Sequence, residues 1–341
     1  LSAQQFLMNM DVEDSLVEWL RCVCRAQRED GALPGIIPTG GWGFDWGNGP
    51  AWDIALTMLP FMLWRINGNL NCFRECADNI YRYIEYIPSK LDDKGLAHYG
   101  LGDWCEVDGP GGELTTPLVV TDTLTLVNLT RMATELFAAV GDNRRSKTCS
   151  ELHDKLVAAF RKHLMNAEHT EVVPLSQAGQ AMAMYYGAFR KDEMQAALVG
   201  LKKAIAKYDG HIQIGVLGAR TLFRVLSDMG ETELAYRMIT RPDYPSFANH
   251  VLTGATTLYE IFRKPSEEFP YTSDMFACGS RNARSLNHHF WGDVSGWFYE
   301  ALGGIRINEG LTKHTDVVID PKTVSALDSV RATHVFKGLG T

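Results

Sequence analysis

The feature that most constrains the fold is a helical repeat of apolar residues that runs through most of the chain. Apolar side chains recur at i, i+3, i+4 and i+7, and Gly, Pro or Asp separates the segments that show this pattern. Very short turns, such as INGNLN at 66–71 and VGDN at 140–143, force consecutive helices to be antiparallel neighbours. The pattern predicts helices at 2–9, 12–28, 50–67, 70–88, 116–140, 143–165, 176–189, 193–208, 215–229, 231–239, 248–263 and 284–303.

Helical hairpins in such number form either an open solenoid or a closed double ring. No repeat motif recurs, and the longer linkers at 29–49, 91–115 and 264–283 are irregular and rich in Gly, Pro, Trp and Asp. We therefore predict an all-α fold, an (α/α)6 barrel or six-hairpin toroid over residues 1–305, whose long loops meet at one end and form a pocket.

The tail at 306–341 changes character. Its segments DVVIDPK and SVRATHVFKG alternate apolar and polar residues, which predicts short β-strands. Two short strands cannot stand alone, so the tail either packs on the barrel or begins a C-terminal β-domain.

Charge and motifs exclude several classes of function. A net charge of -8 without a long Lys/Arg run argues against nucleic acid as a partner, and the longest apolar runs are too short to span a membrane. The chain shows no P-loop, dinucleotide fingerprint or Gly-x-Ser-x-Gly motif, and its seven cysteines lack zinc spacing. We expect no cofactor and no metal.

The stretch GGWGFDWGNGPAWD at 40–53 is the first candidate for chemistry. It combines aromatic faces and carboxylates, namely Trp42, Asp45, Trp46, Trp52 and Asp53, on a glycine-rich backbone. A sugar ring has an apolar face that stacks on indole and hydroxyls that bind carboxylates, so the stretch suits a sugar. The alternative for Asp53 is a place in the first turn of a helix that begins near Pro50, where the helix dipole favours it.

Three further clusters lie in loops or at helix ends. Asp103 and Trp104 belong to HYGLGDWCEVDGPGG, Glu260 to LTGATTLYEIF, and His288 and His289 to SLNHHFWGDVSGWFYE. Glu260 is either a solvated carboxylate on a helix face or, in a run without another charge, a group suited to proton transfer. Adjacent histidines on a helix point to different sides, so we expect at most one of them to face the pocket.

Carboxylates and tryptophans spread over the loops of a helical double ring match the needs of glycosidic cleavage. Several segments, in order, resemble the catalytic domain of the bacterial α-L-rhamnosidases of glycoside hydrolase family 78. The matching pieces are AQREDGALPGIIPTGGWGFDWGNGPAWDIAL, GLGDW, SQAGQAMAM, GVLGARTLFRVLSDMGETELAYRMI, YPSF, TGATTLYE and SLNHHFWGDVSGWFYEALGGI. The resemblance implies inverting hydrolysis of terminal α-L-rhamnose and further β-sandwich domains on either side of the barrel.

The resemblance also assigns roles to single residues. Glu260 takes the place of the general base, Trp104 and either Trp46 or Trp52 would line the rhamnose pocket, and His288 would bind a hydroxyl. Further candidates for substrate binding are Asp45, Asp53 and Asp103. Tyr259 and Phe247 stand where the family has Trp.

The family's general acid is a Glu in an Asp-Glu-Arg segment, and the chain starts after the position of that segment. The resemblance thus implies that the acid lies before Leu1 and that this stretch alone is inactive. LSAQQF also stands for a Gly-Asp-Ala-Gln pattern, so a rhamnose-binding carboxylate would be missing.

Two other functions remain open. One is a polysaccharide lyase that acts on a rhamnose–uronate linkage, and the other is a non-catalytic sugar-binding remnant. Carbohydrate degradation suggests the periplasm or the cell exterior, whereas seven unpaired thiols would suit the cytoplasm.

Overall fold

The computed structural model describes residues 2–107, 114–262, 285–307 and 316–337. Its α-helices are α1 (Ala3–Asn9), α2 (Glu13–Ala26), α3 (Pro50–Asp53), α4 (Ala55–Asn67), α5 (Asn71–Tyr86), α6 (Leu118–Ala139), α7 (Asn143–Leu164), α8 (Gln177–Tyr185), α9 (Met194–Ala206), α10 (Val216–Asp228), α11 (Thr232–Thr240), α12 (Phe247–Leu252) and α13 (Asp293–Trp297). Shorter helical turns are η1 (Ile87–Lys90), η3 (His289–Gly292) and the π-helical η4 (Phe298–Leu302).

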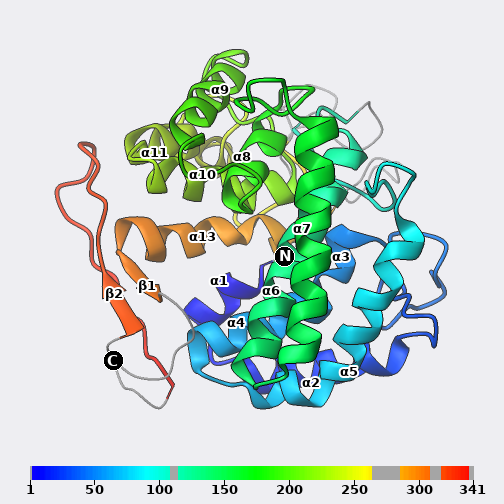
Figure 1. The fold of residues 1–341 in the computed structure, drawn as a ribbon. Coiled ribbons are helices and arrows are strands. Elements are labelled where there is room, and N and C mark those ends of the chain that lie inside the picture. The colour runs from blue at the N-terminus through cyan, green and yellow to red at the C-terminus, as the bar shows by residue number, and fades with distance from the viewer. Residues whose placement is uncertain (1, 108–113, 263–284, 308–315, 338–341) are drawn as a thin grey trace.

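The helices form a closed double ring. In the inner ring α1 contacts α4, and the contacts continue through α6, α8, α10 and α13 back to α1. Outside it, α2 and α5 pack on α4, while α7, α9 and α11 pack on α6, α8 and α10 (Figure 1). The predicted (α/α)6 barrel is therefore confirmed. Within the described ranges, no helix is both long and apolar enough to cross a membrane.

Burial separates the two rings. Every residue of α8 from Gln177 to Met184 is buried, and so is every residue of α10 from Val216 to Ser227. A helix buried on all sides belongs to the core, as the inner ring requires. The outer helix α7 instead buries one stripe at spacings of three and four residues, which includes Cys149, Leu152 and Leu156.

The prediction of a helix over 248–263 is wrong beyond Leu252. Gly254 has a φ of +96°, and the N–H of Ala255 donates to the carbonyl of His250, which ends α12 in a tight turn. The residues from Gly254 to Phe262 form a turn and bends and no helix, and Glu260 N–H donates to Ser285 O at 2.8 Å. The helix predicted over 284–303 likewise begins only at His289.

The tail packs on the barrel. Strand β1 (Ile305–Ile307) pairs antiparallel with β2 (Val317–Ile319), with Arg306 opposite Val318. The DVVIDPK segment thus supplies a strand, whereas the described part of SVRATHVFKG forms none. Phe336 in that segment instead joins the core and is 8% exposed.

Candidate functional site

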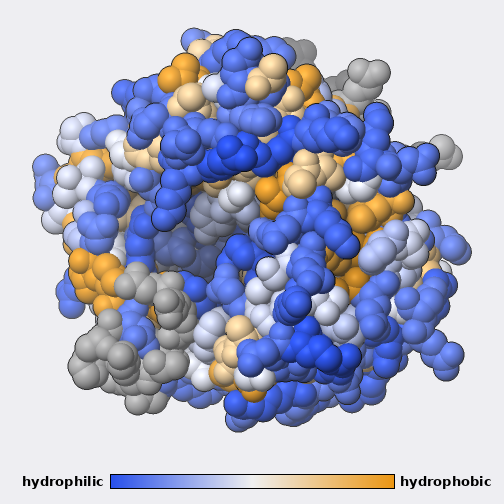
Figure 2. All heavy atoms as spheres, viewed as in Figure 1, coloured by the Kyte–Doolittle hydropathy of each residue, from blue (hydrophilic) through white to orange (hydrophobic). Residues whose placement is uncertain are grey.

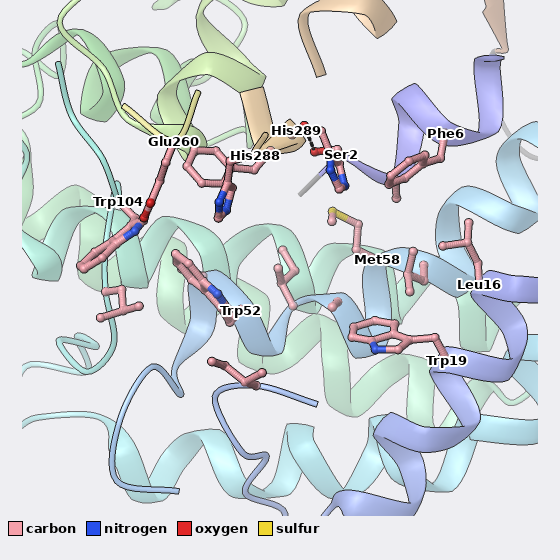
Figure 3. A pocket seen from close by; sticks show the side chains of 18 of the residues that line it. Ser2, Phe6, Leu16, Trp19, Trp52, Met58, Trp104, Glu260, His288 and His289 are labelled. Atoms are coloured by element: carbon pink, nitrogen blue, oxygen red, sulfur yellow. Dashed lines mark hydrogen bonds between the residues drawn. The ribbon is translucent and has the colours of Figure 1, made fainter. Parts of the chain in front are cut away.

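A cavity of about 700 Å³ lies at the N-terminal ends of inner helices α1 and α4. Figure 3 shows side chains from several distant segments pointing into it, with Glu260 and His288 on one side and Trp52 on the other. The predicted site residues that line this cavity are Trp46, Trp52, Trp104, Glu260 and His288. The structure therefore brings these five together from four separate loops and helix ends.

Glu260 is held by its own backbone and by the segment that precedes α13. Its carbonyl accepts a hydrogen bond from the indole Nε1 of Trp291 at 2.9 Å, and Trp291 is 1% exposed. The N–H of Ser285 donates to Glu260 Oε2 at 3.0 Å, and the residue lines the cavity. Cys105 Sγ lies 4.0 Å from Glu260 Oε1. The carboxylate is thus fixed in position and half-buried.

Trp104 is positioned by its neighbour Asp103. The Asp103 carboxylate accepts backbone N–H bonds from Gly215 at 2.7 Å, Leu217 at 2.7 Å and Gly218 at 2.9 Å, so it caps the first turn of α10. The Val216 N–H also donates to the Trp104 carbonyl at 3.0 Å. A Cβ at Gly215 would lie 2.1 Å from the Asp103 carbonyl oxygen, so only glycine permits this approach.

Asp103 is completely buried and does not line the cavity. Burial raises its pKa to about 7, and the charge of Glu106 acts in the same direction against the three backbone N–H groups. The structure therefore gives Asp103 the place of a positioning residue behind Trp104.

Trp46 offers an open aromatic face. It is 41% exposed, its ring centroid lies 4.7 Å from that of Trp42, and it meets Trp104 edge-on at 6.3 Å. Gly35 allows the close approach of this loop, because a Cβ there would lie 2.2 Å from the Trp46 carbonyl oxygen. Asp45 is exposed and outside the cavity lining.

Trp52 and Asp53 point in different directions from α3. Trp52 lines the cavity, whereas Asp53 is 4% exposed and turns inward. Asp53 Oδ2 accepts from Gly49 N–H at 3.2 Å and from the Tyr83 hydroxyl at 2.8 Å. Asp53 therefore occupies the first helical turn, the alternative that the sequence left open.

His288 and His289 both line the cavity, contrary to the expectation that only one would. The expectation was wrong because His288 is extended, with φ -135° and ψ 91°, and its N–H donates to Leu258 O at 2.8 Å. Its ring meets Phe290 edge-on at 4.1 Å. Burial lowers the His288 pKa, although the nearby Glu260 charge opposes this, so the ring is neutral at pH 7.

Sequence reasoning missed the apolar wall of the cavity. It comes from helices α1 and α2 and their neighbours, and its residues include Phe6, Leu16, Trp19, Ile36, Met58 and Leu101. Phe6, Leu16, Trp19 and Met58 have the same helical spacing as core residues, so the sequence carries no signal that sets them apart. No group of three His, Cys, Asp or Glu side chains that could hold a metal ion is found in the described ranges.

A buried acidic pair beneath Trp52 makes stability depend on pH. Burial raises the pKa of Asp53 to about 7 and that of Asp122 on α6 to about 8, and the Asp53 charge adds to the latter. A raised carboxyl pKa favours the folded state at low pH, and this stability is lost as pH rises through 7 and 8.

We expect Asp122→Asn to raise the urea midpoint strongly at pH 8.5 and much less at pH 5, with a gain of at most about 5 kcal/mol. Urea unfolding at the two pH values measures this, with the exposed Asp93→Asn as the control. A variant as pH-dependent as the parent would contradict it.

The chain is similar to known proteins along most of its length. The family model for the bacterial alpha-L-rhamnosidase 6 hairpin glycosidase domain matches residues 1–302. Curated alpha-L-rhamnosidases from Alteromonas sp. (strain LOR) and Streptomyces avermitilis are 24% and 26% identical to the chain. These alignments cover 91% and 93% of the chain, and 33% and 29% of the relatives.

Solved structures show the same fold. The chain matches the alpha-L-rhamnosidase from Dictyoglumus thermophilum with a TM-score of 0.83 and 25% identity over 95% of the chain and 35% of that structure. The Streptomyces avermitilis alpha-L-rhamnosidase complexed with L-rhamnose gives a TM-score of 0.83 at 23% identity, covering 94% of the chain and 29% of that structure. The chain thus spans about a third of the length of these proteins.

Proposed function

Because the chain belongs to the bacterial alpha-L-rhamnosidase six-hairpin glycosidase domain family, we propose that the whole protein hydrolyses terminal α-L-rhamnosides. The observation that carries this proposal is the cavity itself, in which the Glu260 carboxylate shares one space with Trp46, Trp52 and Trp104. About 700 Å³ suits a monosaccharide with part of its aglycone. Indole faces can hold the apolar side of the sugar ring, and the neutral His288 can hydrogen-bond a hydroxyl.

Glu260 would act as the general base. A carboxylate fixed by backbone contacts can take a proton from a water molecule, which then attacks the anomeric carbon from the face opposite the leaving group. The departing oxygen needs a proton from a second carboxyl group, about 6.5–9.5 Å from the first in inverting enzymes. We place that acid on the part of the protein that precedes Leu1, and we place further β-domains beside the barrel.

Proton NMR of the first turnovers tests the reaction. With an aryl α-L-rhamnoside as substrate, we expect β-L-rhamnose to appear first and the α-anomer to follow by mutarotation. Initial release of α-L-rhamnose would contradict the inverting mechanism. An unsaturated product that absorbs in the ultraviolet, formed from a rhamnose–uronate polymer, would identify a lyase instead, and binding without either product would identify a sugar-binding module.

A further inference from the structure

A second cavity of about 430 Å³ lies at the opposite end of the barrel bore. The first cavity contacts the start of α4 at Ala55 and Met58, whereas the second contacts its last turns at Met62 and Arg65. Residues of α1, α6, α10 and β1 complete the lining. Figure 2 shows a hollow with hydrophilic walls on this face, beside α13 and β1.

The lining of the second cavity is strongly cationic. Four arginines face it, namely Arg65, Arg131, Arg220 and Arg306, against one carboxylate, Glu300. Glu300 is already engaged, because Arg224 Nε donates to its Oε2 at 2.6 Å. Glu135 faces both Arg131 and Arg65, and Asp228 pairs with Arg306. Among the four arginines, Arg220 alone has no carboxylate partner in the described part of the chain, and its charge lies in a partly enclosed space, where charges are screened less than in open water.

Arg220 differs from the other three arginines of the lining in its environment. It lies in the middle of α10 and is 8% exposed. Its guanidinium contacts the sulfur of Met58, and no ion pair of Arg220 is found in the described part of the chain. A thioether is a weak acceptor, whereas a guanidinium has five N–H donors. A buried charge in this condition is costly unless an anion pairs with it.

Arg224 lies one helical turn after Arg220 in the same helix and has hydrogen-bonded carboxylate partners. It is buried like Arg220, but it donates to Asp293 Oδ2 at 2.7 Å and to Glu300 Oε2 at 2.6 Å. A Gln4 side chain accepts a third bond at 3.1 Å. The fold thus supplies carboxylates for one buried arginine and leaves the other facing an open cavity.

We propose that the second cavity is a binding site for a small oxyanion, a phosphate or a carboxylate, which pairs with Arg220 at its inner end. Arg131 on α6 and Arg65 on α4 also line the cavity, and each would meet the same anion while it keeps its contact with Glu135. A guanidinium matches the geometry of both anions through two parallel N–H bonds. Because Met58 separates Arg220 from the Glu260 cavity, this site is distinct from the proposed sugar site.

Isothermal titration calorimetry of the whole protein with inorganic phosphate tests the proposal. The chloride concentration is adjusted so that the ionic strength stays constant. We expect one site with a Kd on the order of millimolar or tighter, and Arg220→Leu weakens it at least about tenfold. The control Arg74→Leu removes an exposed arginine that contacts Asn71 and leaves binding unchanged. Arg131→Gln, at a half-buried position, serves as a second variant and also weakens binding.

Thermal unfolding gives an independent readout. Phosphate should raise the Tm of the parent protein and not that of Arg220→Leu. A parallel titration with glucuronate distinguishes free phosphate from the carboxylate of a sugar acid. The anion that binds more tightly identifies which of the two the site takes. If neither anion gave a binding signal, or if the parent and Arg220→Leu bound them equally, the proposal would be overturned. This outcome is independent of whether the protein hydrolyses rhamnosides.

Discussion

Glu260→Gln is expected to lower the kcat for rhamnose release at least about 1,000-fold and to leave rhamnose binding nearly unchanged. Glutamine keeps the size of the side chain and one oxygen, so it can still accept the N–H of Ser285. It cannot take a proton from water. Initial rates with an aryl rhamnoside and calorimetric titration with rhamnose, both on the whole protein, measure the two halves of this expectation.

The matched control is Glu151→Gln, an exposed position on the outer helix α7. This variant should turn over at the parental rate. If Glu260→Gln also kept the parental rate, Glu260 would have no part in the mechanism. If it lost rhamnose binding and turnover together, its role would be to hold the sugar and not to act as the base.

Asp103→Ala is expected to destabilise the protein strongly, by about 3 kcal/mol in the free energy of unfolding. The substitution leaves the N–H groups of Gly215, Leu217 and Gly218 without their carboxylate at the start of α10. Loss of a cap removes about 1 kcal/mol, and each buried unsatisfied donor adds about 1–3 kcal/mol before water or relaxation compensates. Urea unfolding followed by circular dichroism measures this.

The same variant should also impair the site, because Asp103 holds the loop that carries Trp104. We expect a higher KM for the aryl rhamnoside, with a smaller change in kcat, since the indole binds the sugar and does not react with it. Asp45→Ala removes an exposed carboxylate from the Trp46 loop and is the control. Equal stability of Asp103→Ala and Asp45→Ala would rule out the capping role.

The barrel was predictable because its helices are long and strongly periodic. The segment at 248–263 was not, since Leu258, Ile261 and Phe262 follow a helical spacing although the chain forms bends and no helix there. The deciding feature is Gly254, whose positive φ ends α12. A glycine in a periodic run does not by itself reveal whether the helix stops.

Trp46, Trp52 and Trp104 were predictable as candidates because tryptophans are unusual in glycine-rich loops. The roles of Glu260 and His288 came from the resemblance to the family, since the sequence placed both residues in predicted helices. The sequence did not reveal that Asp45, Asp53 and Asp103, beside those tryptophans, lie outside the cavity lining. Asp103 binds amides more than 100 residues away at Gly215 and Gly218, and such partners exist only after folding. Arg220 gave no signal either, because two arginines four residues apart in an apolar helix, Arg220 and Arg224, indicate its exposed face.

A crystal structure of the Glu260→Gln protein soaked with L-rhamnose tests the central claim most directly. We predict one rhamnose in the 700 Å³ cavity, stacked on Trp104 or Trp52, with the residue 260 amide facing its anomeric carbon through a water molecule. A sugar bound elsewhere, or residue 260 turned away from the anomeric carbon, would contradict the account.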